Sequence, residues 1–255
     1  MKRAVAFAGR NVKELIRDPL SYIFCLGFPL VMLALMTVMN DMIPAEAEMT
    51  LFRIDQLAPG IAVFGLSFVM LFATLLVSKD RTGAFLTRLF STPMTAADFI
   101  AGYTLPLIAV AVVQILVCLS VGGVIGLITG VSLSPLRLLL TGLVLLPCAL
   151  FFIAAGVCFG TVFGDKAAPP CCSILISACG VLGGIWFSLD TIPAGHVFGT
   201  ICRVLPFSHF VDMARQALSG QYKDFGAHMA IGLAWMVGAC ILSVILFHVR
   251  MKRDE

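Results

Sequence analysis

The amino-acid sequence predicts an all-α integral membrane protein with six transmembrane helices and an amphipathic helix in front of the first. Composition is the first observation: 60% of the 255 residues are hydrophobic and only 12% are charged, whereas soluble domains average about 45–50% apolar and about 25% charged residues. The second is that the apolar residues gather into six runs, each close to the ~20 residues that a helix needs to cross a bilayer. The apolar surplus is therefore expected to face lipid.

The six predicted spans carry no Asp, Glu, Lys or Arg in their interiors. They cover residues 19–39, 57–78, 99–128, 136–163, 167–189 and 227–249. Three prolines, Pro29, Pro106 and Pro147, fall inside spans and are expected to kink them. Glycines recur every fourth residue at Gly122, Gly126 and Gly130 and again at Gly156, Gly160 and Gly164. This spacing favours close helix packing over a role in a substrate pathway.

Residues 1–18 form a separate predicted element, a cationic amphipathic helix. At about 100° per residue, apolar side chains gather on one face and charged ones on the other, with Phe7 as the misfit. The apolar face holds Ala4, Val5, Ala8, Val12, Leu15 and Ile16, and the charged face Lys2, Arg3, Arg10, Lys13, Glu14 and Arg17. Such a helix should lie in the membrane interface and end at Pro19. The pattern leaves open whether it only anchors the topology or also contacts a partner.

The basic residues predict the orientation. Twelve of the 17 Lys and Arg residues lie at the two termini, in loop 79–98 and in the loop after the fourth span, and five lie on the other side. The positive-inside rule then places both termini in the cytoplasm.

The apolar spans exclude several classes of function. Gln114 is the strongest polar side chain in mid-span, and ion-coupled transporters usually need intramembrane ionisable groups. The spans likewise lack the polar groups of an intramembrane protease, and the chain has no phosphate-binding P-loop. The nine cysteines show neither a disulfide framework nor metal-ligand spacing. Uphill transport by this chain would therefore need energy from another subunit.

Loop 79–98 predicts a short amphipathic helix between two spans. Phe85, Leu86 and Leu89 have helical spacing, and Thr92-Pro93 is expected to end the helix. A cap of the next helix follows, formed by Thr95 with Asp98 three residues later. Such a helix either lies on lipid or docks into a groove of a partner, and periodicity leaves both possibilities open.

A second long connection, residues 190–226, is too polar for a span. It predicts a helix capped by Ser208 and ended by Gly220. One face of that helix is apolar: Phe207, Phe210, Val211, Ala214 and Leu218. The other face, with His209, Asp212, Arg215 and Gln216, is interpreted as the wet side, in preference to a substrate contact.

Loop 79–98 resembles the corresponding loop of ABC-2 type transporter permeases, which commonly follows the pattern Glu-Arg-x-x-Gly-x-Leu-x-Arg-Leu-x-x-Thr-Pro, with Gly-Tyr or Gly-Lys opening the next span. The matching residues are Asp80, Arg81, Gly83, Leu86, Arg88, Leu89, Thr92, Pro93, Gly102 and Tyr103. The chain departs from the pattern at Thr87, where an acidic residue is often found, and Gly83 lies about one residue early. Residues 183–187, 192–193, 205–210 and 215–217 are similar to the family pattern before the last span.

The resemblance covers the whole chain and implies a single permease domain, residues 1–255, with an interface helix (1–18), a cytoplasmic coupling loop (79–98) and an external re-entrant helical segment (190–226). It implies a homo- or heterodimer of permease chains, each bearing a cytoplasmic ABC ATPase subunit. The implied ATPase-coupling residues are Arg81, Gly83, Phe85, Leu86, Arg88, Leu89, Thr92 and Pro93. The chain itself would be no enzyme and bind no cofactor or nucleic acid, because ATP and magnesium belong to the ATPase.

The resemblance further implies an ATP-driven exporter in a bacterial cytoplasmic membrane. The phenylalanine-rich, charge-free spans favour a hydrophobic or amphipathic substrate such as a drug, lipid or peptide. Three tyrosines and two tryptophans offer little for stacking sugars, so a polysaccharide or glycolipid exporter is the alternative. A membrane scaffold for an ATPase without transport, and a membrane enzyme or assembly factor, are the rivals from other classes.

Overall fold

Asp18 and Pro19 separate the N-terminal helix from the first span. The computed structural model describes residues 2–44, 50–83, 95–193 and 196–254. In it α1 (Lys2–Arg17) is followed by α2 (Pro19–Tyr22), whose first turn is capped by the Asp18 carboxylate accepting from the amide of Leu20. A π-helical turn, η1 (Ile23–Gly27), leads into α3 (Phe28–Met42). The turn ends two residues before Pro29, which cannot donate a backbone hydrogen bond.

The helix α4 (Ile54–Thr82) is the central element. It contacts α3, α6, α8, α9 and α11. In its most apolar stretch of 18 residues 89% of the residues are buried, against 17% for the stretch formed by η1 and α3 and 17% for the last helix. Protein therefore surrounds α4 on nearly all sides, which explains why its apolar sequence has no polar face.

The third and fourth predicted spans differ in regularity. α6 (Ala96–Ile128) begins at a capping box in which Thr95 and Asp98 bond each other's backbone amides, as expected, and it continues through Pro106. The fourth span is divided into α7 (Pro135–Val144) and α8 (Leu146–Val162) at Leu145, two residues before Pro147. The small residues of α8 lie against α4: a Cβ at Gly160 would sit 2.7 Å from the carbonyl oxygen of Thr74.

The fifth predicted span, residues 167–189, is shorter than expected. α9 (Ala168–Leu182) ends at Gly183, and Gly184 adopts a φ of +64°, which a residue with a side chain disfavours. Residues 183–188 leave the helical path, and η3 (Leu189–Thr191) is a single 3₁₀ turn. The chain thus has five helices of spanning length and apolarity within its described residues, with α9 as a shorter apolar sixth.

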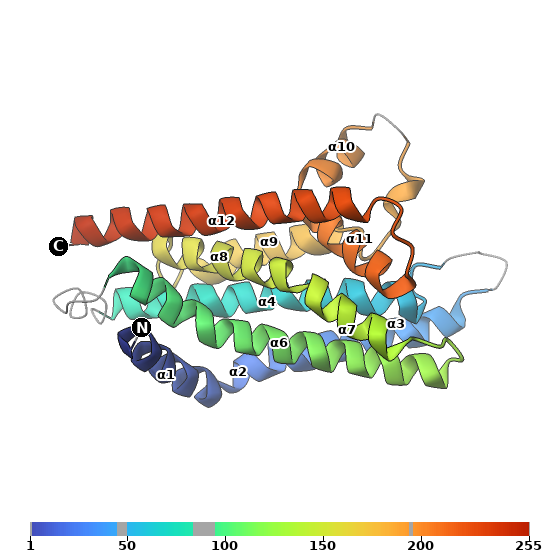
Figure 1. Cartoon of the computed structure of the whole chain (residues 1–255), viewed down its shortest axis with the longest axis horizontal. Coiled ribbons are helices and arrows are strands. Elements are labelled where there is room, and N and C mark those ends of the chain that lie inside the picture. The colour runs from blue at the N-terminus through green and yellow to red at the C-terminus, as the bar shows by residue number, and fades with distance from the viewer. Residues whose placement is uncertain (1, 45–49, 84–94, 194–195, 255) are drawn as a thin grey trace.

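Between α9 and the last helix the chain forms two short helices, α10 (Val197–Val204) and α11 (Pro206–Ser219). The predicted apolar face of α11 is buried and its end at Gly220, with φ +76°, is confirmed. The predicted cap at Ser208 was wrong: the helix starts at Pro206, and the Ser208 hydroxyl donates to the carbonyl of Cys202. α12 (Phe225–Asp254) then runs back along α8, so both chain ends lie at one end of the bundle (Figure 1). We call this the termini end; α10 and α11 lie at the opposite end.

Candidate functional site: the junction of α1, α4 and α6

A buried carboxylate joins three helices at the termini end. The guanidinium of Arg10 on α1 donates two hydrogen bonds of 2.6 Å, one to each Asp80 oxygen near the end of α4. The hydroxyl of Tyr103 on α6 donates to the same carboxylate over 2.9 Å. Because the Asp80 side chain is only 3% exposed, these hydrogen bonds offset the cost of burying the carboxylate. The hydrogen bond to Asp80 also raises the pKa of Arg10 above its ordinary value.

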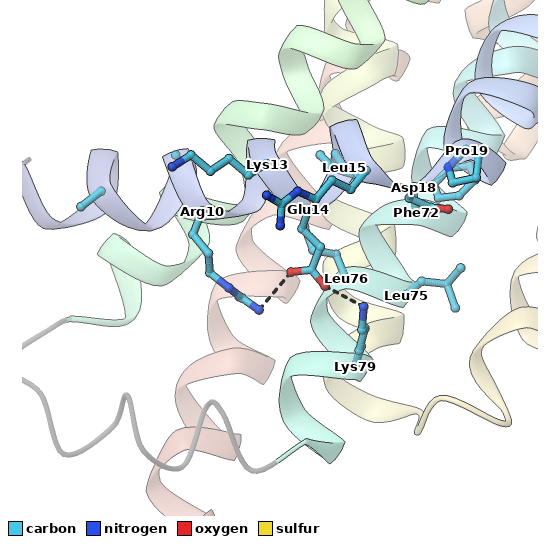
Figure 2. A pocket seen from close by; sticks show the side chains of 13 residues that line it. Arg10, Lys13, Glu14, Leu15, Asp18, Pro19, Phe72, Leu75, Leu76 and Lys79 are labelled. Carbon is cyan, nitrogen blue, oxygen red and sulfur yellow. Dashed lines mark hydrogen bonds and ion pairs between the residues drawn. The ribbon is translucent and has the colours of Figure 1, made fainter.

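A second ion pair lies beside the first, nearer to solvent. The Glu14 carboxylate accepts from Lys79 at 2.8 Å and pairs with Arg10 at 3.0 Å. Figure 2 shows Glu14 reaching from α1 toward α4, between Arg10 and Lys79. Lys79 is largely exposed, so this pair is screened by solvent and contributes less to stability than the Asp80 cluster.

Close packing between α1 and α6 completes the junction. Gly102 leaves room for the Phe7 ring, which a Cβ at this position would overlap. Phe7 makes edge contacts with Phe99 and Tyr103, and the buried amide of Asn11 donates to the Gly102 carbonyl over 3.0 Å. The interface helix is therefore fixed to α6 by shape and by hydrogen bonding.

The helical wheel identified only part of the protein-facing side of α1. The side chains buried against the bundle are Ala4, Phe7, Ala8, Asn11 and Leu15, whereas Val5, Val12 and Ile16 are exposed. Phe7 is thus a central packing residue and not a misfit. Hydrophobicity alone could not separate the side of α1 that meets protein from the side that is expected to meet lipid.

The last turn of α4 is tied to the segment between α8 and α9. Arg81 donates to the backbone carbonyl of Thr161, and the Thr82 hydroxyl donates to the Asp165 carboxylate over 2.6 Å. Gly83 ends α4, with its amide bonded to the carbonyl of Lys79. Arg81 and Gly83 therefore lie at the end of α4, where Arg81 contacts the end of α8. Six of the predicted ATPase-coupling residues lie outside the described residues: Phe85, Leu86, Arg88, Leu89, Thr92 and Pro93.

Sequence reasoning missed the residues that build the junction. Asp80, Gly102 and Tyr103 were recognised as parts of a motif, without a role, and Arg10 was one of several cations on a charged face. Only the spacing of the motif hinted that Asp80 and Tyr103 belong together. Nothing in the sequence paired either of them with Arg10.

The junction borders a large cavity between α1 and α4, of about 910 Å³. On the α1 side it is lined by charged residues together with Ala6, Gly9 and Leu15, and on the α4 side by Phe72, Leu75, Leu76 and Lys79 (Figure 2). Within the described residues no group of three or more His, Cys, Asp or Glu side chains could hold a metal ion. The contacts described at the junction are ion pairs, hydrogen bonds and packing contacts.

At the opposite end, α11 is held by polar contacts that were predicted to be wet. His209 is 7% exposed and its Nδ1 lies 2.8 Å from Nδ1 of His228 on α12. Arg215 donates to the carbonyls of Gln56 and Gly184 over 3.1 Å each. The interpretation of His209 as a wet residue was therefore wrong, and Arg215 is a structural link between α11, α4 and the end of α9. A cavity of about 780 Å³, bordered by Trp186, Asp212 and Arg215, opens beside it.

Comparison with known proteins identifies the family. No curated protein matches the chain. The family model described as ABC-2 type transporter matches residues 4–219, which is well over half of the chain and includes the α1–α4–α6 junction, the 79–98 loop and α11. The chain therefore belongs to the ABC-2 type transporter family and is a multi-pass membrane permease component of an ABC transporter.

Proposed function

We propose that this permease is the membrane-spanning subunit of an ATP-driven exporter and that the α1–α4–α6 junction transmits the motion of a cytoplasmic ATPase to the spans. In this proposal the termini end faces the cytoplasm of a bacterium, and the segment 79–98 docks on the ATPase. The buried Asp80 cluster is the observation that carries the proposal, because it fixes the base of that segment to two other helices.

The mechanism follows from where the segment begins and ends. It leaves α4 at Gly83 and enters α6 through the capping box at Thr95. Both helices are joined to α1 through Asp80, and α4 is joined to the α8–α9 connection through Arg81 and Thr82. A displacement of the segment would therefore move these helix ends as one body. The coupling energy would come from the differential binding of the segment to ATP-bound and ATP-free ATPase.

The decisive experiment is co-purification of the detergent-solubilised chain with its ATPase. We expect an ATPase subunit to accompany the wild type and to be lost from the Arg88→Glu, Leu89→Asp double variant. A matched control, Arg53→Glu with Leu51→Asp, alters the same residue types at the opposite end and should retain the ATPase. Absence of an ATPase from the wild type would refute the coupling mechanism.

The proposed cargo is hydrophobic or amphipathic, and the proposed assembly is a dimer of two permease chains. Support comes from the described spans, in which the Thr74 hydroxyl and the amide nitrogen of Gln114 donate hydrogen bonds to backbone carbonyls within the bundle. Reconstituted vesicles provide the test: apolar compounds should stimulate ATP hydrolysis and move out of the compartment that holds the ATPase. Stimulation by a long polysaccharide alone would favour a polysaccharide exporter, and ATP hydrolysis without any transport would favour the scaffold.

A further inference from the structure

We propose that the cavity between α1 and α4 binds an anionic phospholipid, with the phosphate at Lys13 and Arg17 and an acyl chain along α4. The inference goes beyond the proposed function, because it concerns a lipid bound by the permease chain itself. It rests on three properties of this cavity: uncompensated positive charge, apolar lining residues, and a neighbouring apolar cavity that lacks such charge.

The charged groups around the cavity do not balance. Four basic residues, Arg10, Lys13, Arg17 and Lys79, and two acidic ones, Glu14 and Asp18, line it. Both acids are engaged: Glu14 pairs with Arg10 and Lys79, and the Asp18 carboxylate caps α2. Arg10 is bonded to Asp80.

Two cations remain without a carboxylate. Lys13 and Arg17 are exposed, and within the described part of the chain neither forms an ion pair. They stand four residues apart on α1, hence on one face and about 6 Å apart along the helix axis. A phosphate between them could accept hydrogen bonds from the ammonium and from the planar guanidinium. This is the chemistry that a phosphodiester headgroup needs.

The apolar residues that line the cavity suit the acyl chain of a lipid. Phe72, Leu75 and Leu76 of α4 line it together with Leu15 and Pro19. This stretch of α4 lies in a span of high hydropathy. The cavity therefore passes from a cationic wall to an apolar one, as an amphipathic ligand does, whereas a soluble anion would use only the cationic wall.

A second cavity, on the other flank of α1, provides an internal comparison. It measures about 290 Å³ and is lined by Val12, Leu15, Ile16, Pro106 and other uncharged residues of α2, η1 and α6. Both cavities share Leu15 and can accept an acyl chain, but only the α1–α4 cavity offers cations. Selectivity for an anionic headgroup would therefore arise from the α1–α4 cavity.

Native mass spectrometry of the detergent-purified chain tests the proposal. The probes are dioleoylphosphatidylglycerol and, as the zwitterionic comparison, dioleoylphosphatidylcholine. We expect preferential retention of phosphatidylglycerol, and a roughly 10- to 30-fold weaker apparent Kd for it in the Lys13→Gln, Arg17→Gln double variant. The Lys166→Gln, Lys223→Gln variant removes the same charge elsewhere and should bind as the wild type does. Equal loss in both variants, or no loss in either, would overturn the site.

Two further measurements separate the lipid from other ligands. A Leu75→Trp variant should be quenched more strongly by a brominated phosphatidylglycerol than by a brominated phosphatidylcholine, and the difference should vanish when Lys13 and Arg17 are also replaced by Gln. Equal quenching by both lipids would mean that bulk lipid covers the cavity and would overturn the proposal. Glycerol phosphate should fail to displace the lipid at equal concentration; full displacement would assign the cations to a soluble phosphate ester instead.

Discussion

The ring of Phe7 occupies the space that a side chain at position 102 would need, so α1 can approach α6 only because residue 102 is glycine. We expect Gly102→Ala to push α1 away from the bundle and to weaken the bond from Asn11 to the Gly102 carbonyl. Overpacking of this kind costs about 1–3 kcal/mol. The midpoint of thermal unfolding of the detergent-purified protein measures it.

The same contact offers a rescue. Phe7→Ala alone opens a cavity and is destabilising. The double variant with Gly102→Ala should lose less stability than the sum of the two single losses, because the smaller side chain at position 7 makes room for the added methyl group. If the two losses simply add, Phe7 and Gly102 are not in contact, and the packing described for α1 is wrong.

A double-mutant cycle tests the link between Arg10 and Asp80. Arg10→Gln removes the guanidinium that donates two hydrogen bonds to the buried carboxylate, and we expect a loss of about 1–3 kcal/mol in the free energy of unfolding. Because the Arg10 side chain is 36% exposed, solvent reduces this value below that of a fully buried pair. Arg10→Gln in an Asp80→Asn background should cost clearly less. Equal costs in both backgrounds would show that the two residues do not interact.

Packing between α8 and α4 predicts opposite outcomes for two glycines. A Cβ at Gly160 would lie 2.7 Å from both the Thr74 carbonyl oxygen and the Val77 Cβ, whereas at Gly238 nothing lies within 4 Å. Gly160→Ala should therefore lower the unfolding midpoint, because backbone cannot move aside cheaply. Gly238→Ala should leave it unchanged or raise stability by about 0.5–1 kcal/mol, as an alanine does inside a helix. Identical behaviour of the two variants would contradict the close approach of α8 to α4.

The histidine pair predicts how α11 is held to α12. In its neutral form His209 donates through Nε2 to the Arg203 carbonyl, so its Nδ1 accepts from His228. His228→Ala would leave a buried acceptor unpaired, and we expect a cost of about 1–3 kcal/mol. In a His209→Phe background the same change should cost much less, because no acceptor remains. Thermal unfolding of the four proteins gives both values, and an unchanged cost in the second background would exclude the bond.

The sequence predicted the elements that depend on local patterns. The Thr95–Asp98 capping box, the break at Pro19 and the end of α11 at Gly220 each rest on residues within a few positions of one another, and all three are confirmed. Local chemistry decides such features because the interacting groups are covalently close. The long runs of apolar residues likewise predicted that the protein spans a membrane.

Contacts between distant residues were beyond the sequence. Arg10 and Asp80 are 70 residues apart, and a cation on a charged face has no local mark of its partner. The prediction that His209 is exposed to water was wrong for a related reason. Its position on the helix predicted exposure, but α12 covers that face and supplies His228. The helix start predicted at Ser208 was wrong because proline is favoured in the first turn of a helix, and α11 therefore begins at Pro206. The Ser208 hydroxyl then lies inside the helix and donates to the carbonyl of Cys202.

The short length of α9 has a consequence for the membrane around it. Its 15 residues extend about 22 Å, less than the ~30 Å hydrocarbon thickness that the longer helices match. We expect residues 183–188 to make up the deficit; their backbone leaves the helical path, and Arg215 donates a hydrogen bond to the Gly184 carbonyl there. We therefore expect a thicker bilayer to strain the flank of the bundle formed by α9 before any other.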